Sequence, residues 1–299
     1  MPQHERILVI GATGTQGGAT TERLLKQGQR VRAVTREPQS LQAQAMRWCN
    51  LEIVVGDLDA PETIRSAMEG VTGVFSMQNP GPDEVVHSRV VAQAARNAGV
   101  RQLVHSSVSG TGVHQTMPGW AEGRWNRAYW EGKWKAEQAA WESGLPCITI
   151  FKPAFMMENF GHPKARSMFP DLAQGQILTA VTPQTRIPMI AAADIGAFAA
   201  HAFADPERYS GKSIDLAGDR PTLPEIAEIL SNVTGNTVTA RTLTRDQLIA
   251  RGQLGGWVDM QIWFDEIGYP ASPETSGEYG VPLTDFNAWA HLNREIIIN

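Results

Sequence analysis

A tyrosine and a lysine four residues apart, Tyr129 and Lys133, are the side chains in this sequence best suited to proton chemistry. On a helix this spacing places both side chains on one face. A protonated lysine near a phenol favours the phenolate and lowers the pKa of the tyrosine toward neutrality. The tyrosine can then exchange a proton with a substrate oxygen while a hydride moves to or from a nicotinamide. The pair therefore predicts acid–base catalysis.

A structural interpretation of the same segment stays open. Trp125, Trp130 and Trp134 flank Tyr129 in the sequence, so the phenol can be a packing residue while Lys133 holds only the ribose of a cofactor. Trp120 and Trp125 lie in a glycine-containing stretch, where they form either a lid over an apolar substrate or part of a core.

A hydroxyl at the end of the fifth predicted strand would orient the substrate carbonyl. We take Ser107 as the candidate, and Ser106 and Ser109 compete with it. The sequence does not decide which of the three faces the nicotinamide.

A glycine-rich segment follows the first predicted strand, and its glycines are spaced as GxxGxxG. Glycines let the backbone turn tightly and approach a pyrophosphate, while the first N–H groups of the helix that follows point at the phosphates. The position after an apolar strand, inside repeating strand–helix units, indicates a dinucleotide site more strongly than the spacing does. The predicted phosphate-binding residues are Gly11, Thr13, Gly14, Thr15, Gln16 and Gly17.

The ends of the second and third predicted strands indicate which dinucleotide binds. An NAD site usually carries an acidic residue after the second strand, whereas this chain has Arg36 there. A guanidinium can form charge-assisted bonds to a 2′-phosphate, which predicts NADP(H) rather than NAD(H); the alternative is a solvated surface cation. Asp57 and Leu58 follow the third strand, where Asp57 either bonds the adenine amino group or caps a turn.

Apolar runs alternate with helical patterns through the first half of the chain, as is typical of a parallel sheet covered by helices. Crossovers of this length join parallel strands with a right-handed turn. The fold class is therefore predicted as α/β, a Rossmann-type doubly wound parallel sheet with a smaller, partly helical C-terminal lobe on the substrate side. Strands are expected at Arg6–Ile10, Val31–Thr35, Leu51–Val55, Val71–Met77, Gln102–Ser106 and Cys147–Phe151.

Two domains of unequal size are expected. Residues 1–152 form the NAD(P)-binding domain, completed by segments within 191–218, with Ile214–Leu216 returning to the sheet. Residues 153–299 form the smaller, discontinuous lobe. Its regular pattern predicts helices near Asp194–Phe203, Leu223–Thr234, Thr244–Arg251 and Asp285–Arg294.

Bulk composition excludes several classes of partner. The formal net charge is −5, and the 26 lysines and arginines form no basic block, so neither nucleic acid nor an anionic membrane is an expected partner. The longest apolar tract, Met189–Ala204, is too short and too polar to span a bilayer. The seven histidines form no metal-binding pattern, so no metal site is expected.

Cysteine content and the N-terminal residues predict a cytoplasmic protein. Cys49 and Cys147 lie far apart, which favours two small buried thiols in a reducing compartment. The polar start, MPQHER, has no apolar stretch of the kind a secretory leader needs.

Six segments together resemble the NmrA-like family, atypical members of the short-chain dehydrogenase/reductase superfamily. They are GATGTQGG at 11–18, VRAVTREP at 31–38, VVGDLD at 54–59, YWEGK at 129–133, KPAFMMENF at 152–160 and AAADIG at 191–196. The resemblance implies that NADP(H) is contacted by residues Gly11 to Gln16, Arg36, Asp57, Lys133, and Met156, Glu158 and Asn159.

The family contains reductases and also cofactor-binding regulators, in which the tyrosine is often replaced by histidine. Tyr129 therefore favours an enzyme: an NADP(H)-dependent oxidoreductase that reduces a small apolar carbonyl, quinone or related acceptor. The alternative is a catalytically weak NADP(H)-binding redox sensor or transcriptional co-regulator, which would act through a regulatory protein partner. A nucleotide-sugar epimerase is a third hypothesis. A small-molecule substrate is the expected partner in the first case, and a homodimer is compatible with each.

Overall fold

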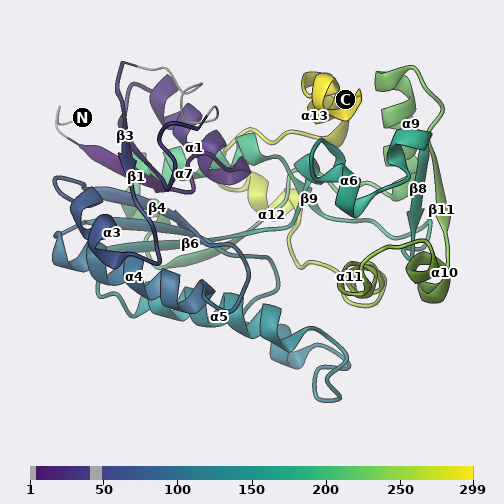
Figure 1. Ribbon diagram of the computed structural model, residues 1–299, viewed down its shortest axis with the longest axis horizontal. Coiled ribbons are helices and arrows are strands. Elements are labelled where there is room, and N and C mark those ends of the chain that lie inside the picture. The colour runs from purple at the N-terminus through teal and green to yellow at the C-terminus, as the bar shows by residue number, and fades with distance from the viewer. Residues whose placement is uncertain (1–4, 41–48, 299) are drawn as a thin grey trace. The chain divides into compact units, whose positions relative to one another are not determined.

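A seven-stranded sheet organises the first half of the chain in the computed structural model, which describes residues 5–40 and 49–298 (Figure 1). Its strand order is β10-β6-β5-β4-β1-β2-β3, and each recorded pairing from β3 to β6 is parallel. The strands are β1 (Arg6–Ile10), β2 (Arg30–Thr35), β3 (Leu51–Val55), β4 (Gly73–Met77), β5 (Gln102–Ser106), β6 (Cys147–Pro153) and β10 (Lys212–Leu216). The order reverses between β1 and β4, as in a Rossmann sheet, and the predicted fold class is confirmed.

Helices cover both faces of this sheet. Figure 1 shows α1 (Thr15–Lys26) and α7 (Ala192–Ala204) on one face, and α3 (Pro61–Ala67), α4 (Glu84–Asn97) and α5 (Arg127–Trp141) on the other. A Cβ added to Gly196 of α7 would lie 2.6 Å from the carbonyl oxygen of Ala19, so the two helix backbones can approach this closely only with glycine at that position. Burial of strand residues such as Leu8, Val74 and Leu103 between the layers stabilises the sheet.

The chain divides into two compact units. The first comprises residues 1–112, 127–152 and 192–214, and the second comprises residues 113–126, 153–191 and 215–299. β10 takes its place beside β6, as the sequence predicted for Ile214–Leu216. The short α8 (Pro206–Tyr209) precedes it.

The second unit contains two small two-stranded sheets and mostly short helices. β8 (Gln176–Thr179) pairs with β11 (Thr239–Thr242), and β7 (Phe155–Met156) pairs with β9 (Met189–Ile190). Helix α11 (Gly255–Glu266) was not predicted, because its apolar and polar residues do not separate onto two faces. The helices are α6 (Ala165–Met168), α9 (Leu223–Thr234), α10 (Arg245–Ala250), α11 (Gly255–Glu266), α12 (Pro273–Gly277), α13 (Phe286–Leu292) and α14 (Arg294–Ile298).

Aromatic side chains fill the core of the second unit. The rings of Phe155 and Trp257 stack at a centroid distance of 5.8 Å, and Trp263 is buried nearby in the same unit. Trp120 and Trp125, considered above for a lid, are also buried, and the indole of Trp125 donates to the carbonyl of Pro118 at 2.6 Å. These two tryptophans therefore pack as core residues and do not form an exposed lid.

Two further predictions concern the surroundings of the protein. No helix among residues 5–40 and 49–298 combines the length and the apolar character needed to cross a bilayer. Both cysteines are free, but only Cys147 is buried, and the expectation of a buried Cys49 is wrong: its thiol is exposed after β2. Residues 1–4, which belong to the polar start of the chain, lie outside the described residues.

Candidate active site

The glycine-rich segment connects β1 to α1 by a tight turn. Gly11 has φ +70°, and its carbonyl accepts a hydrogen bond from the Gly14 N–H at 2.9 Å. A Cβ added to Gly17 would lie 2.2 Å from that same carbonyl oxygen, closer than real atoms approach. The turn therefore requires glycine at both ends, for conformational freedom at Gly11 and for space at Gly17.

The first turn of α1 fits a bound phosphate. Its N-cap is Gly14, which has no side chain to cap the helix, and no acidic residue occupies the first turn. The first N–H groups of any α-helix lack partners within the helix, and they are directed at the space before it, where the dipole favours an anion. Thr13 and Gly14 are exposed at this turn. The residues present thus fit the pyrophosphate of a dinucleotide.

A methyl group at position 17 is expected to impair cofactor binding strongly. The added Cβ of Gly17→Ala forces the Gly11 carbonyl to move, and overpacking of this kind costs about 1–3 kcal/mol. We expect the Kd for NADPH to rise at least about tenfold, as measured by fluorescence titration. Gly256→Ala in α11 is the control, because a Cβ there meets open space. Unchanged affinity in Gly17→Ala would show that the phosphates do not bind at this turn.

Arg36 and Asp57 differ in their surroundings. Arg36 is exposed after β2, whereas Arg32 in the same strand is buried and paired with Glu52 at 2.9 Å. Of the two arginines, Arg36 is therefore the one that a ligand can reach. The Asp57 carboxylate accepts a hydrogen bond from the Asp59 N–H at 3.1 Å, which is the turn-capping role that the sequence left open. Leu58 beside it is half-buried and packs against the core of the sheet.

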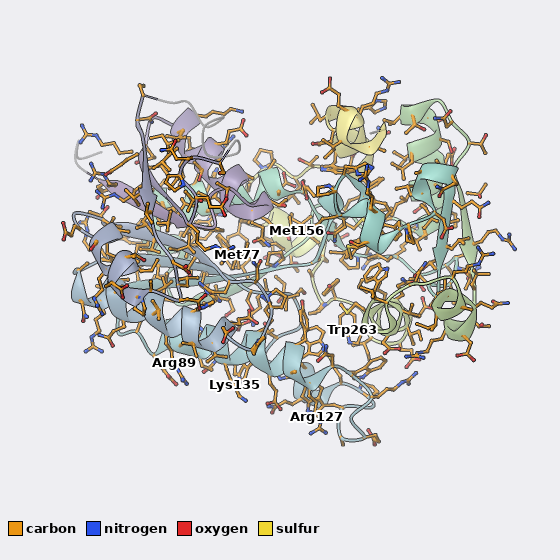
Figure 2. All side chains as sticks on the ribbon, in the orientation of Figure 1. Met77, Arg89, Arg127, Lys135, Met156 and Trp263 are labelled. Carbon is orange, nitrogen blue, oxygen red and sulfur yellow. The ribbon has the colours of Figure 1, made fainter. Side chains whose placement is uncertain are left out.

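The acid–base candidates lie on α5, where Lys133 connects two other elements. Its Nζ lies 2.6 Å from a carboxylate oxygen of Glu84 in α4, and it donates to the carbonyl oxygen of Gln78 at 3.1 Å. Gln78 follows β4, whose last residue, Met77, is labelled in Figure 2 and lies beside Gly11 of the phosphate turn. Lys133 is therefore held at the carboxyl edge of the sheet, close to the end of β4.

The phenol of Tyr129 is half-buried one helical turn before Lys133. Burial raises the pKa of Tyr129 above its ordinary value, and the negative charge of Glu84 raises it further. The expectation that Lys133 lowers this pKa is wrong, because burial is the larger effect and the carboxylate of Glu84, with which Lys133 is paired, adds to it. A phenol with a raised pKa stays protonated near neutral pH, so it is suited to donate a proton and not to abstract one.

The three candidate serines have different environments. The Ser106 hydroxyl donates to Gln16 of the phosphate turn at 2.6 Å, while the Ser107 hydroxyl donates to the carboxylate of Glu137 at 2.5 Å. Ser109 is fully buried. The structure thus links Ser106 to the predicted cofactor loop and Ser107 to α5.

The carboxylate that accepts the Ser107 hydrogen bond belongs to a buried ion pair, Glu137–Lys152, which was not predicted from the sequence. Glu137 is fully buried, and its carboxylate lies 3.2 Å from Nζ of Lys152, near the end of β6. Thr111 donates its hydroxyl to the same carboxylate, and its carbonyl accepts from Lys152 at 2.9 Å. One sequence feature could have indicated Glu137: it continues the i, i+4 series of Tyr129 and Lys133 along α5. Nothing comparable marks Glu84.

Met156, Glu158 and Asn159, which the family resemblance implies as cofactor contacts, belong to the second unit. Met156 ends β7, and the other two lie in the short 3-10 helix that follows it. The Glu158 carboxylate accepts a hydrogen bond from the indole of Trp289 at 3.1 Å, and Asn159 is buried. Their role toward a cofactor stays a prediction.

Comparison with known proteins identifies the relatives of this chain. The NmrA-like family model matches residues 3–276. The NmrA-like family domain-containing oxidoreductase FrzB of Cladobotryum sp is 30% identical over 258 residues, covering 77% of this chain and 73% of that protein. An NAD(P)H azoreductase of Xenophilus azovorans is 27% identical over 249 residues, covering 81% and 78%.

Solved structures share the fold. An NADPH-dependent quinone oxidoreductase of Escherichia coli, in complex with NADPH, superposes with a TM-score of 0.76 at 24% identity, covering 96% of this chain and 99% of that one. The negative transcriptional regulator NmrA gives a TM-score of 0.76 at 19% identity, covering 97% and 95%. Both curated relatives described above carry the names of oxidoreductases, which confirms the predicted enzyme class. With a family model matched over most of its length, the chain belongs to the NmrA-like family.

Proposed function

We propose that this protein is an NADP(H)-dependent oxidoreductase that reduces a small apolar carbonyl, quinone or related acceptor. The observation that carries the proposal is a convergence at one edge of the sheet. Gln16 of the phosphate turn bonds Ser106 at the end of β5, and Lys133 bonds the carbonyl of Gln78 after β4. The phosphate turn and the helix α5, which carries the candidate proton donor, are thus both bonded to residues at the carboxyl edge of the sheet. Ligands of doubly wound sheets bind at this edge.

The acceptor class is inferred from chemistry that several relatives share. Relatives named above act on quinones or carry the name azoreductase, and a structural neighbour is a triphenylmethane reductase of Citrobacter sp.. Quinones, azo compounds and triphenylmethane dyes are all conjugated molecules, and each can take up a hydride. We therefore infer a conjugated acceptor of this kind. In the second unit Arg186 and Arg245 are already paired with Glu225 and Asp259, which disfavours a sugar-nucleotide substrate.

Each proposed site residue has a role in this reaction. The turn from Gly11 to Gly17 holds the phosphates, Arg36 the 2′-phosphate, and Lys133 the nicotinamide ribose. The bound cofactor supplies a hydride. Tyr129 donates the proton that neutralises the reduced acceptor oxygen, and Ser107 orients that oxygen by exchanging its bond with Glu137. We assign Asp57 and Leu58 to the adenine, and the resemblance to the family is the basis for assigning Met156, Glu158 and Asn159 to the cofactor.

The proposal is tested by binding and then by turnover. The purified protein is titrated with NADPH, NADP+, NADH and NAD+, and the loss of reduced-nicotinamide absorbance is then followed with quinones, azo dyes and aromatic aldehydes. We expect tight NADPH binding and oxidation by at least one acceptor. Absence of affinity for every nucleotide would refute the proposal. Tight binding without turnover, together with a partner protein whose affinity follows the NADPH/NADP+ ratio, would establish a redox sensor instead.

Arg36→Ala is expected to reduce the preference for NADPH. Charge-assisted hydrogen bonds contribute roughly 1.5–3 kcal/mol each, so the Kd for NADPH should rise about tenfold or more. The Kd for NADH, which lacks the 2′-phosphate, should stay nearly constant. Arg30→Ala is the matched control, because Arg30 is an exposed arginine at the opposite end of the same strand. Equal losses for NADPH and NADH would contradict the assigned role of Arg36.

A further inference from the structure

A buried carboxylate, Glu84, lies in the first turn of α4 and is only 3% exposed. Its partner Lys133 is almost as deeply buried, with 8% of its side chain exposed. We propose that Glu84 is a positioning residue for the reaction: it fixes the ammonium of Lys133 at the end of β4 and places a negative charge near Tyr129. This inference rests on the function proposed above, and it concerns a residue that no sequence motif marks.

The first step of the argument is the anchoring of Lys133. A lysine side chain is long and flexible, and its ammonium has three donors. Here Nζ of Lys133 lies 2.6 Å from a carboxylate oxygen of Glu84, and it donates a hydrogen bond to the carbonyl oxygen of Gln78 at 3.1 Å. Taking both charges out of water is costly unless their geometry is well matched, so the pair holds Lys133 in one place.

The second step concerns the space that the carboxylate occupies. Gly132 precedes Lys133 in α5, and a Cβ added there would lie 3.3 Å from the second carboxylate oxygen of Glu84. Glycine is unfavourable inside a helix by about 1 kcal/mol relative to alanine. Its presence at this position leaves room for the Glu84 carboxylate against the helix backbone.

The third step concerns charge. Among the described residues, Glu84 from α4 acts electrostatically on Tyr129, and Lys133 acts on His105 from β5. The strand β4 carries no titratable side chain. Burial and the nearby Lys133 ammonium lower the pKa of His105 to about 3, so His105 is neutral near pH 7. Burial raises the pKa of Glu84 and Lys133 opposes that rise, so the charge of Glu84 depends on its partner. When it is ionised, Glu84 places a negative charge beside the phenol and adds to the larger effect of burial, which raises the pKa of Tyr129.

The first test needs neither cofactor nor acceptor. The ionisation of Tyr129 is followed by phenolate absorbance as the difference between a protein and its Tyr129→Phe counterpart. Glu84→Gln removes the anion and leaves the Lys133 ammonium, so we expect the Tyr129 midpoint to fall by at least about one pH unit. Glu131→Gln is the control, because Glu131 forms an exposed pair with Lys135 on the same helix. An unchanged midpoint in Glu84→Gln overturns the proposal.

The second test uses the holoenzyme with an active acceptor. In Glu84→Gln, kcat should fall about tenfold or more with little change in KM, and the alkaline limb of its pH profile should move to lower pH. A fall in kcat without movement of that limb indicates a merely structural role and overturns the proposal. If no acceptor is ever turned over, the proposed function fails while the phenolate titration still decides the placement of Glu84.

A second variant keeps the inference testable if Glu84→Gln does not fold. Gly132→Ala retains every charge and improves helix propensity, but its Cβ presses on the Glu84 carboxylate. We expect a melting temperature at least equal to that of the wild type together with a several-fold lower kcat. Wild-type kcat and an unchanged Tyr129 midpoint in this variant would overturn the proposal.

Discussion

Tyr129→Phe is expected to lower kcat for acceptor reduction by about 10²–10⁴-fold, the usual contribution of a positioned general acid. The substitution removes one hydroxyl and keeps the ring, so the edge-to-face contact with Trp130 at 5.4 Å is preserved. A phenol with its ordinary pKa is already protonated over the physiological range, and burial and Glu84 raise the pKa of Tyr129 further. The wild-type rate of reduction should therefore remain nearly constant from neutral to mildly alkaline pH.

The control for this variant is Tyr279→Phe, which removes a half-buried phenol from the second unit. Both variants should bind NADPH with wild-type affinity, because Tyr129 is assigned to the acceptor and not to the phosphates. Stopped-flow measurement of a single turnover separates the chemical step from product release. If Tyr129→Phe reduces the acceptor at the wild-type single-turnover rate, Tyr129 is not the proton donor and the packing interpretation of this residue is correct.

The strand and helix pattern of the first unit could be predicted because it depends on local information. Each strand up to β6 is a short apolar run next to a helical pattern, and alternation of the two specifies a parallel sheet. The capping box of α9, in which Thr222 and Glu225 bond each other's backbone, marks the helix start in the sequence in the same way. Helix α11 has neither a capping side chain nor a one-sided apolar pattern, and it was missed.

Only the part of the candidate site that consists of near neighbours along α5 could be predicted from the sequence. The spacing of Tyr129 and Lys133 gave the shared helix face, but the pKa of Tyr129 depends on Glu84, which comes from another helix. The choice between Ser106 and Ser107 likewise depends on distant partners, Gln16 and Glu137. Contacts between residues far apart in the chain produce no periodic pattern in a single sequence. The direction of the shift in the pKa of Tyr129 could therefore not be obtained from residue spacing alone.

A second large effect, on the free energy of unfolding, is expected when the buried ion pair between Glu137 and Lys152 is broken. Lys152→Met removes the cation from the buried pair with Glu137 and leaves a fully buried carboxylate without a counter-charge. Removing one partner of a buried pair typically costs 3–5 kcal/mol, so we expect the free energy of unfolding in urea to fall by about that amount. Lys135→Met, which breaks the exposed pair with Glu131, should cost only about 0–1 kcal/mol.

A double variant separates the loss of charge compensation from the loss of packing. In Glu137→Gln/Lys152→Met the amide oxygen still accepts hydrogen bonds from Ser107 and Thr111, but no charge remains buried. If the uncompensated carboxylate causes the instability, the double variant must be more stable than Lys152→Met alone. If instead the contact of Lys152 with the ring of Trp134 dominates, the two variants will be equally unstable.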